Sequence, residues 1–484
     1  MSGWGGASGP AVARLFHRLL ALVFLDAWLS LGVQLHELLG SRGLLPAAEL
    51  IGHARDAQTP WHELPTVFYG GASDLALTVG VLAGIVLALL AIVGAAPRVC
   101  VGLSTLLYLS YVTVGRTFFS FQWDNLLLEC GFFAMFLPRD RRSAWIHYLF
   151  RAILFKLYWE SGIAKWQSHL GDWQDGTAMN AYYQTAPLPT WIAFYAHALP
   201  GWWHHLESWA TLGFELVLPF AIFGPRAARL FAFAFFTIFQ VANAATANYG
   251  FFVYLALVLH VFLLDDRDVE RGLGWLRSRL RRPPLHPATE RVLVSVRRKK
   301  LELATAVTIG GLFLLFSSIE ALESFTDARA LHATFEPLRA LYVPFRIINT
   351  YHLFGHITTE RIEPEVETFD GDRWTAHDFR HKAGDPSRRP GFVAPHQPRV
   401  DFQLWFYGLS YQHGTPGYVA NLLDRVCNDP SAVEGLFAAP LPPKPESVRL
   451  RFYRYEFTTP SEKRASHAWW RRTQVDESRP LPCS

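Results

Sequence analysis

The most regular feature of the sequence is a series of long apolar stretches within its first 320 residues. Each approaches the roughly 20 residues that a helix needs to cross a hydrocarbon core of about 30 Å. Nine stretches can be distinguished: Leu19–Leu38, Leu75–Gly94, Val99–Gly115, Phe118–Leu137, Trp145–Ala164, Glu207–Phe223, Ala227–Asn243, Gly250–Leu264 and Leu301–Ile319. The pattern predicts a polytopic α-helical membrane bundle with about nine transmembrane helices.

The basic residues between these stretches gather on one side. The segment 265–300 carries eleven Lys and Arg residues. The other joints on that side hold Arg98, Arg139, Arg141, Arg142, Arg226 and Arg229, whereas the opposite joints hold Arg42, Arg55, Arg116 and Lys165. The positive-inside rule therefore places the N-terminus and the basic loop in the cytosol and the C-terminal region on the exported side.

The hydrophobic period changes after residue 320. Asp370-Gly371 lies between two short alternating segments, which predicts a β-hairpin with a type I′ turn. In the segment Ser447–Thr458 the alternation slips by one residue between Phe452 and Tyr453, as a β-bulge would require. The intervening segments 402–409 and 418–426 read as helices. We therefore expect an exported, β-rich C-terminal domain.

The predicted organisation has two parts. Residues 1–320 form the bundle, with exported loops at 39–74 and 166–206 and a basic cytosolic loop at 265–300, and residues 321–484 form the exported domain. Charged residues make up 18% of the chain, against about 25% in soluble domains. The basic loop borders an apolar stretch, so membrane lipids are the expected partner and nucleic acid is not.

The four cysteines divide between the two parts. Cys427 and Cys483 fall in the exported domain, where a disulfide can form, but two unpaired thiols are equally compatible with the sequence. There is no CxxC pair and no Cys/His spacing typical of zinc. We expect no metal and no cofactor.

Polar residues within the fourth and fifth stretches need partners, because an ionisable group at membrane depth costs about 2.5–3.5 kcal/mol. Gln122, Asn125 and Glu129 share one helix face, and Asp124 lies beside that face. Lys156 and Glu160 are four residues apart and are expected to pair within their helix. These groups either hold the helices together or line a polar cavity, and the sequence leaves both interpretations open.

Lys165 is the candidate for chemistry. It ends the fifth stretch near the exported surface and has no acidic residue three or four positions before it. A buried lysine there could act as a base, although a lysine extending to the lipid headgroups is the simpler interpretation. No nucleophile, metalloprotease or phosphate-binding motif is present, so whether the protein is an enzyme stays uncertain, with a non-enzymatic role favoured.

Several segments resemble the lipase maturation factor family: 121–124, 159–165, 184–189, 248–250, 346–355, 358–361 and 385–399. The exported residues within this resemblance include Asn349, Arg388, Arg389, His396 and Arg399. His396 stands in a Pro-rich turn and is expected to be structural. The resemblance implies a membrane-bound chaperone that, in eukaryotes, lies in the endoplasmic reticulum membrane of the secretory pathway and helps secreted lipases to mature.

A fainter similarity leads to an alternative. The segment 158–165, followed by Asp172-Trp173, looks like the stretch around the base lysine of vitamin K-dependent γ-glutamyl carboxylases, with Lys165 at the position of the base. That would imply a membrane enzyme that modifies exported proteins or lipids. The sequence has no Asn-x-Ser/Thr glycosylation site and uses Arg, Ala and Leu heavily. We therefore favour a bacterial cytoplasmic membrane over the endoplasmic reticulum.

Overall fold

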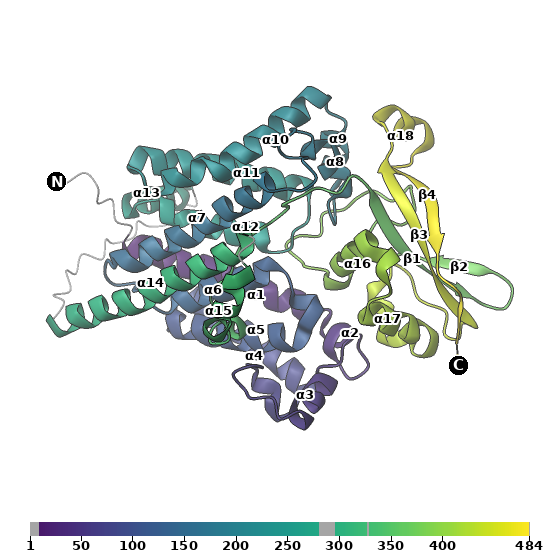
Figure 1. Cartoon of the computed structure of the whole chain (residues 1–484), viewed down its shortest axis with the longest axis horizontal. Coiled ribbons are helices and arrows are strands. Elements are labelled where there is room, and N and C mark those ends of the chain that lie inside the picture. Colours follow the sequence, from purple (N-terminus) through teal and green to yellow (C-terminus); the bar gives the residue numbers. More distant parts are fainter. Residues whose placement is uncertain (1–8, 280–295, 327–328, 484) are drawn as a thin grey trace.

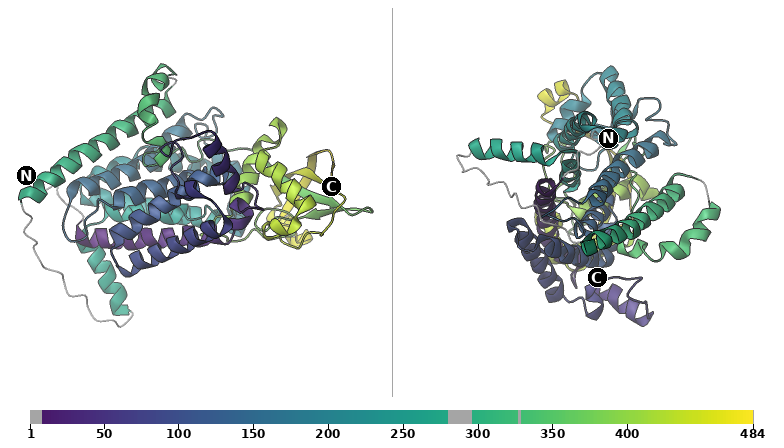
Figure 2. Two further views of the ribbon diagram at one scale, coloured as in Figure 1. Left: turned by 90° about the horizontal axis from the view of Figure 1, so that it is seen from below. Right: turned by 90° about the vertical axis from the view of Figure 1, so that its left-hand side faces the viewer.

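In the computed structural model, which describes residues 9–279, 296–326 and 329–483, a helical bundle carries a sheet-containing domain at one end (Figure 1). The helices before the sheet are α1 Pro10–Gly32, α2 Leu35–Leu39, α3 Ala47–Asp56, α4 Asp74–Val93, α5 Pro97–Gly115, α6 Gln122–Ala134, α7 Ala144–Trp166, α8 Ala178–Thr185, α9 Trp191–His197, α10 Gly201–Leu216, α11 Arg226–Thr246, α12 Phe252–His260, α13 Asp266–Arg279, α14 Val296–Phe325 and α15 Arg329–Arg339. Figure 2 shows the long helices running along the molecule toward the C-terminal domain.

Six helical segments in the described part of the chain are long and apolar enough to cross a membrane. They are Pro10–Gly32, Asp74–Val93, Pro97–Phe119, Gly201–Phe223, Arg226–Thr246 and Glu302–Phe325. The chain is therefore a polytopic helical membrane protein. The three other predicted spans correspond to α6, which has 13 residues, to α7, which carries several charged residues, and to the short α12. The number nine stays a prediction.

Helix α4 shows how an apolar sequence becomes a lipid-facing helix. Ser73 caps its first turn by accepting a hydrogen bond from the Ala76 amide, and Gly94 ends it in the left-handed conformation. Only a third of its most apolar window is buried inside the protein. Leu75, Val79 and other large apolar side chains stay exposed, as expected for a helix whose outer face contacts lipid.

The first helix begins earlier than predicted. Helix α1 starts at Pro10 and ends at Gly32, whereas the hydropathy pattern indicated Leu19–Leu38. The polar residues of its first turns find partners inside the protein: the His17 ring contacts the carbonyl oxygens of Ala13 and Ala134 at 2.8 and 3.1 Å. A polar side chain that is hydrogen-bonded inside the protein does not end a helix. The helix therefore begins before the apolar stretch does.

The C-terminal domain contains an antiparallel sheet and three helices (Figure 1). Its elements are β1 Arg361–Phe369, β2 Trp374–His377, α16 Arg399–Ser410, α17 Gly417–Asn428, β3 Ser447–Phe457, α18 Pro460–Ser466, β4 Trp470–Glu477 and β5 Leu481–Pro482. The strand order is β2-β1-β3-β4, and β5 pairs with β3. Helix α16 packs on β1 and α17 packs on β3, and eight consecutive residues of the central strand β1 are buried.

The hairpin and the bulge lie where the pattern placed them. Strands β1 and β2 pair up to Phe369 and Trp374, and the β3–β4 register shifts between Phe452 and Tyr453. The predicted two-residue turn is wrong, because four residues connect β1 to β2. Asp370 explains the longer loop: its carboxylate accepts hydrogen bonds from the Asp372 and Arg373 amides at 3.1 and 2.9 Å. Gly371 has a φ of +94°.

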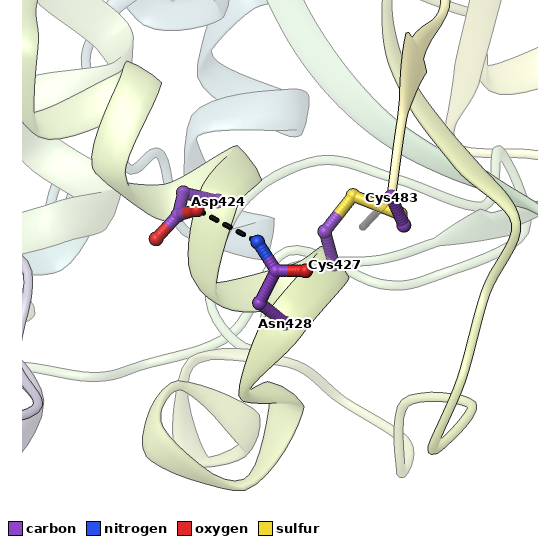
Figure 3. The surroundings of a disulfide bond; sticks show 4 residues. All are labelled: Asp424, Cys427, Asn428 and Cys483. Carbon is purple, nitrogen blue, oxygen red and sulfur yellow. Dashed lines mark hydrogen bonds between the residues drawn. A yellow bond between two sulfur atoms is a disulfide. The ribbon is translucent and has the colours of Figure 1, made fainter.

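A disulfide joins Cys427, on α17, to Cys483, next to β5 (Figure 3). The Cα atoms are 5.1 Å apart, and 56 residues separate the two positions in sequence. The bond connects the chain end to the helix that covers the sheet. Cys100 and Cys130, in the bundle, are free and buried.

The bundle extends beyond the predicted domain boundary. Residue 320 falls inside α14, which continues to Phe325, and residues 342–357 contact the bundle before β1 begins. Within the predicted basic loop, α13 covers Asp266–Arg279, and residues 280–295 lie outside the described residues. Helix α13 is at the end of the bundle remote from the C-terminal domain (Figures 1 and 2).

Candidate functional site

The polar residues predicted inside the membrane gather where the segment 342–357 enters the bundle. Glu129 of α6 is fully buried, and its carboxylate accepts hydrogen bonds from the Tyr351 hydroxyl and from Asn349 Nδ2, the latter at 3.2 Å. The ammonium group of Lys156, on α7, is 3.8 Å from the other carboxylate oxygen. A buried carboxylate is thus surrounded by donors.

The expected pairing of Lys156 with Glu160 is wrong. Lys156 Nζ donates to the Asn349 carbonyl at 2.7 Å and to Ser317 Oγ at 3.0 Å, and its ion pair is with Glu129. Glu160 instead accepts a hydrogen bond from the Tyr351 amide at 2.9 Å. Buried partners on other segments have replaced the helical i, i+4 contact, which contributes only about 0.2–0.5 kcal/mol in isolated helices.

The remaining predicted residues of α6 contact the same segment. Gln122 Oε1 accepts a hydrogen bond from the His352 amide at 3.0 Å, and the Asn125 carbonyl accepts one from Asn349 Nδ2 at 3.4 Å. The shared helix face predicted for Gln122, Asn125 and Glu129 is therefore a docking face for the segment 349–352.

Asp124 holds α16 of the C-terminal domain. Both of its carboxylate oxygens accept hydrogen bonds from the Arg399 guanidinium at 2.9 Å, and the Tyr108 hydroxyl donates to it at 2.6 Å. Arg399 also donates to the Phe118 carbonyl at 2.6 Å, and its guanidinium lies over the Phe119 ring at 3.6 Å. Such a bidentate, charge-assisted contact is among the strongest polar contacts in proteins.

The other residues of the family motif lie in two places. His396 contacts Ser30 of α1 through Nδ1 at 2.9 Å, which agrees with a structural role. Arg388 donates to the Phe379 carbonyl at 2.7 Å inside the C-terminal domain, and Arg389 is exposed beside it. Asn349 and Arg399 are therefore at the bundle, and Arg388 and Arg389 are not.

Sequence reasoning missed a buried charged cluster at the start of the sheet. Glu363 forms ion pairs with Arg361 and Lys382, each at 2.5 Å. Lys382 also donates to the Asp401 carbonyl at 3.2 Å, and burial raises the pKa of the Asp401 carboxyl to about 6, with the Lys382 charge opposing that shift. Arg361 further donates to the Pro187 carbonyl at 2.8 Å. The sequence signal for this cluster was the alternation of charged residues along a strand that also carries apolar residues.

Lys165 is neutralised by a partner that its own helix does not provide. Its ammonium group lies 2.6 Å from Glu215 of α10 and donates to the Leu353 carbonyl at 2.7 Å. The Trp173 ring lies 5.3 Å away. The sequence offers no acidic residue three or four positions before Lys165, and the neutralising carboxylate comes from another helix instead.

A cavity of about 60 Å³ adjoins the Lys165–Glu215 pair. Its polar lining includes Tyr158 and Gln240, which are joined by a hydrogen bond of 3.0 Å. A cavity with this volume and this polar lining can hold ordered water molecules, each of which needs about two to four polar partners. The cavity suits hydration of a buried ion pair. In the described part of the chain, no group of three His, Cys, Asp or Glu residues could hold a metal ion.

Fold and contacts together define a polytopic membrane protein whose C-terminal domain is fixed to its helix bundle by buried polar residues. The lipase maturation factor transmembrane domain matches residues 11–271, and the lipase maturation factor C-terminal domain matches residues 347–480. The chain belongs to the lipase maturation factor family.

Relatives of both named types are similar over nearly the whole chain. Lipase maturation factor 2 of Gallus gallus is 30% identical over 96% of this chain and 80% of its own length. Lipase maturation factor 1 is 29% identical in Bos taurus, over 95% of this chain and 86% of that protein, and 29% identical in Homo sapiens, over 94% and 85%. No solved structure matches the chain. These comparisons give no support to the carboxylase-like alternative.

Proposed function

We propose that this protein is a membrane-bound maturation factor that helps secreted proteins to fold and assemble, with lipases as its clients. The names of its relatives support the client class. The observation that carries the proposal is the buried bidentate contact between Arg399 and Asp124. It holds the C-terminal domain against the bundle, so that both parts offer a client one continuous surface.

That surface contains apolar side chains suited to an incompletely folded client. Phe392 and Phe406 of the C-terminal domain are exposed, as are Trp166 and Tyr195 of the loop 166–206. Exposed aromatic groups bury a large apolar area when they contact a partner. A folding client exposes apolar surface of its own, which such side chains can cover.

For the location, we propose that the N-terminus and the basic loop are cytosolic and that the C-terminal domain is exported, across a bacterial cytoplasmic membrane. The Cys427–Cys483 disulfide supports an exported domain, because disulfides persist in oxidising compartments. Helix α13, at the remote end of the bundle, begins the basic segment. An endoplasmic reticulum membrane would give the same orientation in a eukaryotic cell.

The function can be tested in cells that secrete a lipase, with and without this chain. We expect the chain to raise the lipase activity per secreted molecule, and we expect crosslinking in the cell to recover the lipase with it. A secreted non-lipase enzyme serves as the control client. Unchanged lipase activity together with no crosslinked lipase would refute the proposal.

The orientation is tested separately by fusing alkaline phosphatase after Ile319 or within the segment 267–300. The enzyme is active only where it is exported, so only the first fusion should be active. An active fusion in the basic segment would contradict the orientation without bearing on the client.

A further inference from the structure

A second cavity, of about 160 Å³ and with a strongly basic lining, lies between the C-terminal domain and the loop 166–206. The cationic side chains along it are Arg361, Arg380, Lys382, Arg388 and Arg389. Among the described residues that line the cavity there is no carboxylate. The bundle cavity beside Lys165 differs in charge. Its lining contains the Glu215 carboxylate, which neutralises the lysine.

The five cations are not equally neutralised. Glu363, which is not part of the lining, forms ion pairs with Arg361 and Lys382. Arg388 donates to the carbonyl oxygens of Phe379 and Arg380, which fix its guanidinium, and the nearby Asp385 carboxylate interacts with it electrostatically. The remaining two, Arg380 and Arg389, are exposed and form no ion pair with a carboxylate in the described part of the chain. Glu37 lies near enough to Arg380 to interact with it electrostatically. Acidic groups therefore surround the cavity, but the charged residues that line it are all cationic.

A neighbouring histidine is uncharged at neutral pH. Burial lowers the pKa of His381, which also lines the cavity, to about 4, and the nearby His396, Arg380 and Arg388 contribute to that shift. A neutral imidazole remains a hydrogen-bond donor or acceptor for a ligand.

The wall of the cavity is fixed to the end of the bundle that carries the C-terminal domain. Pro189, in the lining, forms an isolated antiparallel β-bridge with Ala247, the residue that follows α11. Asn248 Nδ2 donates to the carbonyls of Leu188 and Gly391, both lining residues, at 3.0 Å. The exposed Phe392 ring, also in the lining, contacts Trp191 with 6.2 Å between ring centroids. The cavity thus lies beside the C-terminal end of α11, one of the helices long and apolar enough to cross a membrane.

We propose that this cavity binds a phosphate group, presented by a phospholipid headgroup at the membrane surface or free in solution. Guanidinium groups bind phosphate oxygens through two parallel hydrogen bonds, and a rigid, partly neutralised cluster keeps its unpaired arginines oriented toward such a ligand. Arg380 and Arg389 supply the charge that the ligand neutralises. Arg388 and Lys382, held by their carbonyl and carboxylate contacts, shape the site. The binding is independent of the proposed action on lipases.

The test uses the full-length protein in detergent and a double variant, Arg380→Gln with Arg389→Gln. Binding is measured by calorimetry with two probes, dihexanoylphosphatidylglycerol and inorganic phosphate. The matched control, Arg373→Gln with Arg479→Gln, removes the same charge from exposed positions outside the cavity. We expect the first variant to bind at least about tenfold more weakly than the control variant.

The two probes separate the sources of the phosphate. Binding of the lipid probe alone supports a headgroup, and binding of inorganic phosphate as well supports a soluble ligand. Equal affinities in the two double variants, or no binding of either probe to the unchanged protein, would overturn the proposal. If the Arg380→Gln/Arg389→Gln protein fails to fold, as judged by gel filtration, the single variant Arg389→Gln is compared with Arg373→Gln under the same criteria.

Discussion

The contact between Arg399 and Asp124 predicts a large loss of stability when one partner is removed. Arg399 is 1% exposed and Asp124 is not exposed. Replacing Arg399 by Met removes both hydrogen bonds of 2.9 Å and leaves Asp124 with only the Tyr108 hydroxyl. Breaking a buried ion pair from one side costs about 3–5 kcal/mol, because a buried charge is left uncompensated. That is a large fraction of the about 5–15 kcal/mol that keeps a domain folded.

The chain offers a matched control at the same contact between bundle and C-terminal domain. Arg42, in the loop 39–74, forms an ion pair with Asp429, but its side chain is 62% exposed. Exposed pairs contribute little, since solvent screens them. Arg42→Met should therefore leave the unfolding transition unchanged. The measurement is unfolding of the purified protein in mixed micelles, with limited proteolysis to detect release of the C-terminal domain.

A double variant separates two causes of the stability loss, which are the missing hydrogen bonds and the uncompensated buried charge. Asp124→Leu combined with Arg399→Met removes both charges, and we expect it to recover most of the stability lost in Arg399→Met. If Arg399→Met unfolds at the same denaturant concentration as Arg42→Met, the buried pair does not hold the C-terminal domain and the reasoning fails.

The remaining predictions concern the bundle, the hairpin and the disulfide. Lys165→Met should lower the free energy of unfolding by about 3–5 kcal/mol, because it leaves the Glu215 charge buried and uncompensated. The double variant Lys165→Met with Glu215→Leu should lose much less stability and should still mature lipase. A stable but inactive double variant would show that Lys165 takes part in chemistry. Gly371→Val should destabilise the C-terminal domain by about 1–2 kcal/mol in denaturant unfolding, because its φ of +94° is unfavourable for a β-branched residue, and an unchanged midpoint would contradict this. Replacing Cys427 and Cys483 by Ser should cost about 4 kcal/mol for a loop of 56 residues, and alkylation of these thiols in the native protein without reductant would contradict the disulfide.

Local patterns predicted most of the elements of secondary structure. The apolar run that becomes α4, helices α16 and α17 of the C-terminal domain and the β-bulge between Phe452 and Tyr453 all depend on residues close together in sequence. Hydropathy also identified α6 and α7 as parts of the bundle. It could not show whether they cross the membrane, since a charged residue with buried partners lowers the hydropathy of a helix without preventing its burial.

The partners of the buried charges could not be predicted in the same way. Lys156 pairs with Glu129 on another helix although Glu160 is one turn away, and Arg399 finds Asp124 across 275 positions. Such contacts depend on how the helices pack, and a local i, i+4 contact is weak enough to be replaced by any buried partner. The sequence showed that the Lys165 ammonium group was unusual at its position. The carboxylate that pairs with it, on Glu215, could be identified only from the packing of α10 on α7.

The distribution of the motif residues bears on how this protein acts. Asn349 and Arg399 are buried and contact Glu129 and Asp124, so they determine how the segment 342–357 and α16 fit the bundle. Changing them should reduce function only as far as it reduces folded protein. Arg389, by contrast, is exposed beside a basic cavity, and its loss should leave the fold intact. Two motif residues from one short segment therefore differ in role: Arg399 holds the C-terminal domain on the bundle, and Arg389 belongs to the proposed phosphate site. A variant that folds normally and fails to mature a client should be sought among the exposed residues, and not among the buried charges that first drew attention in the sequence.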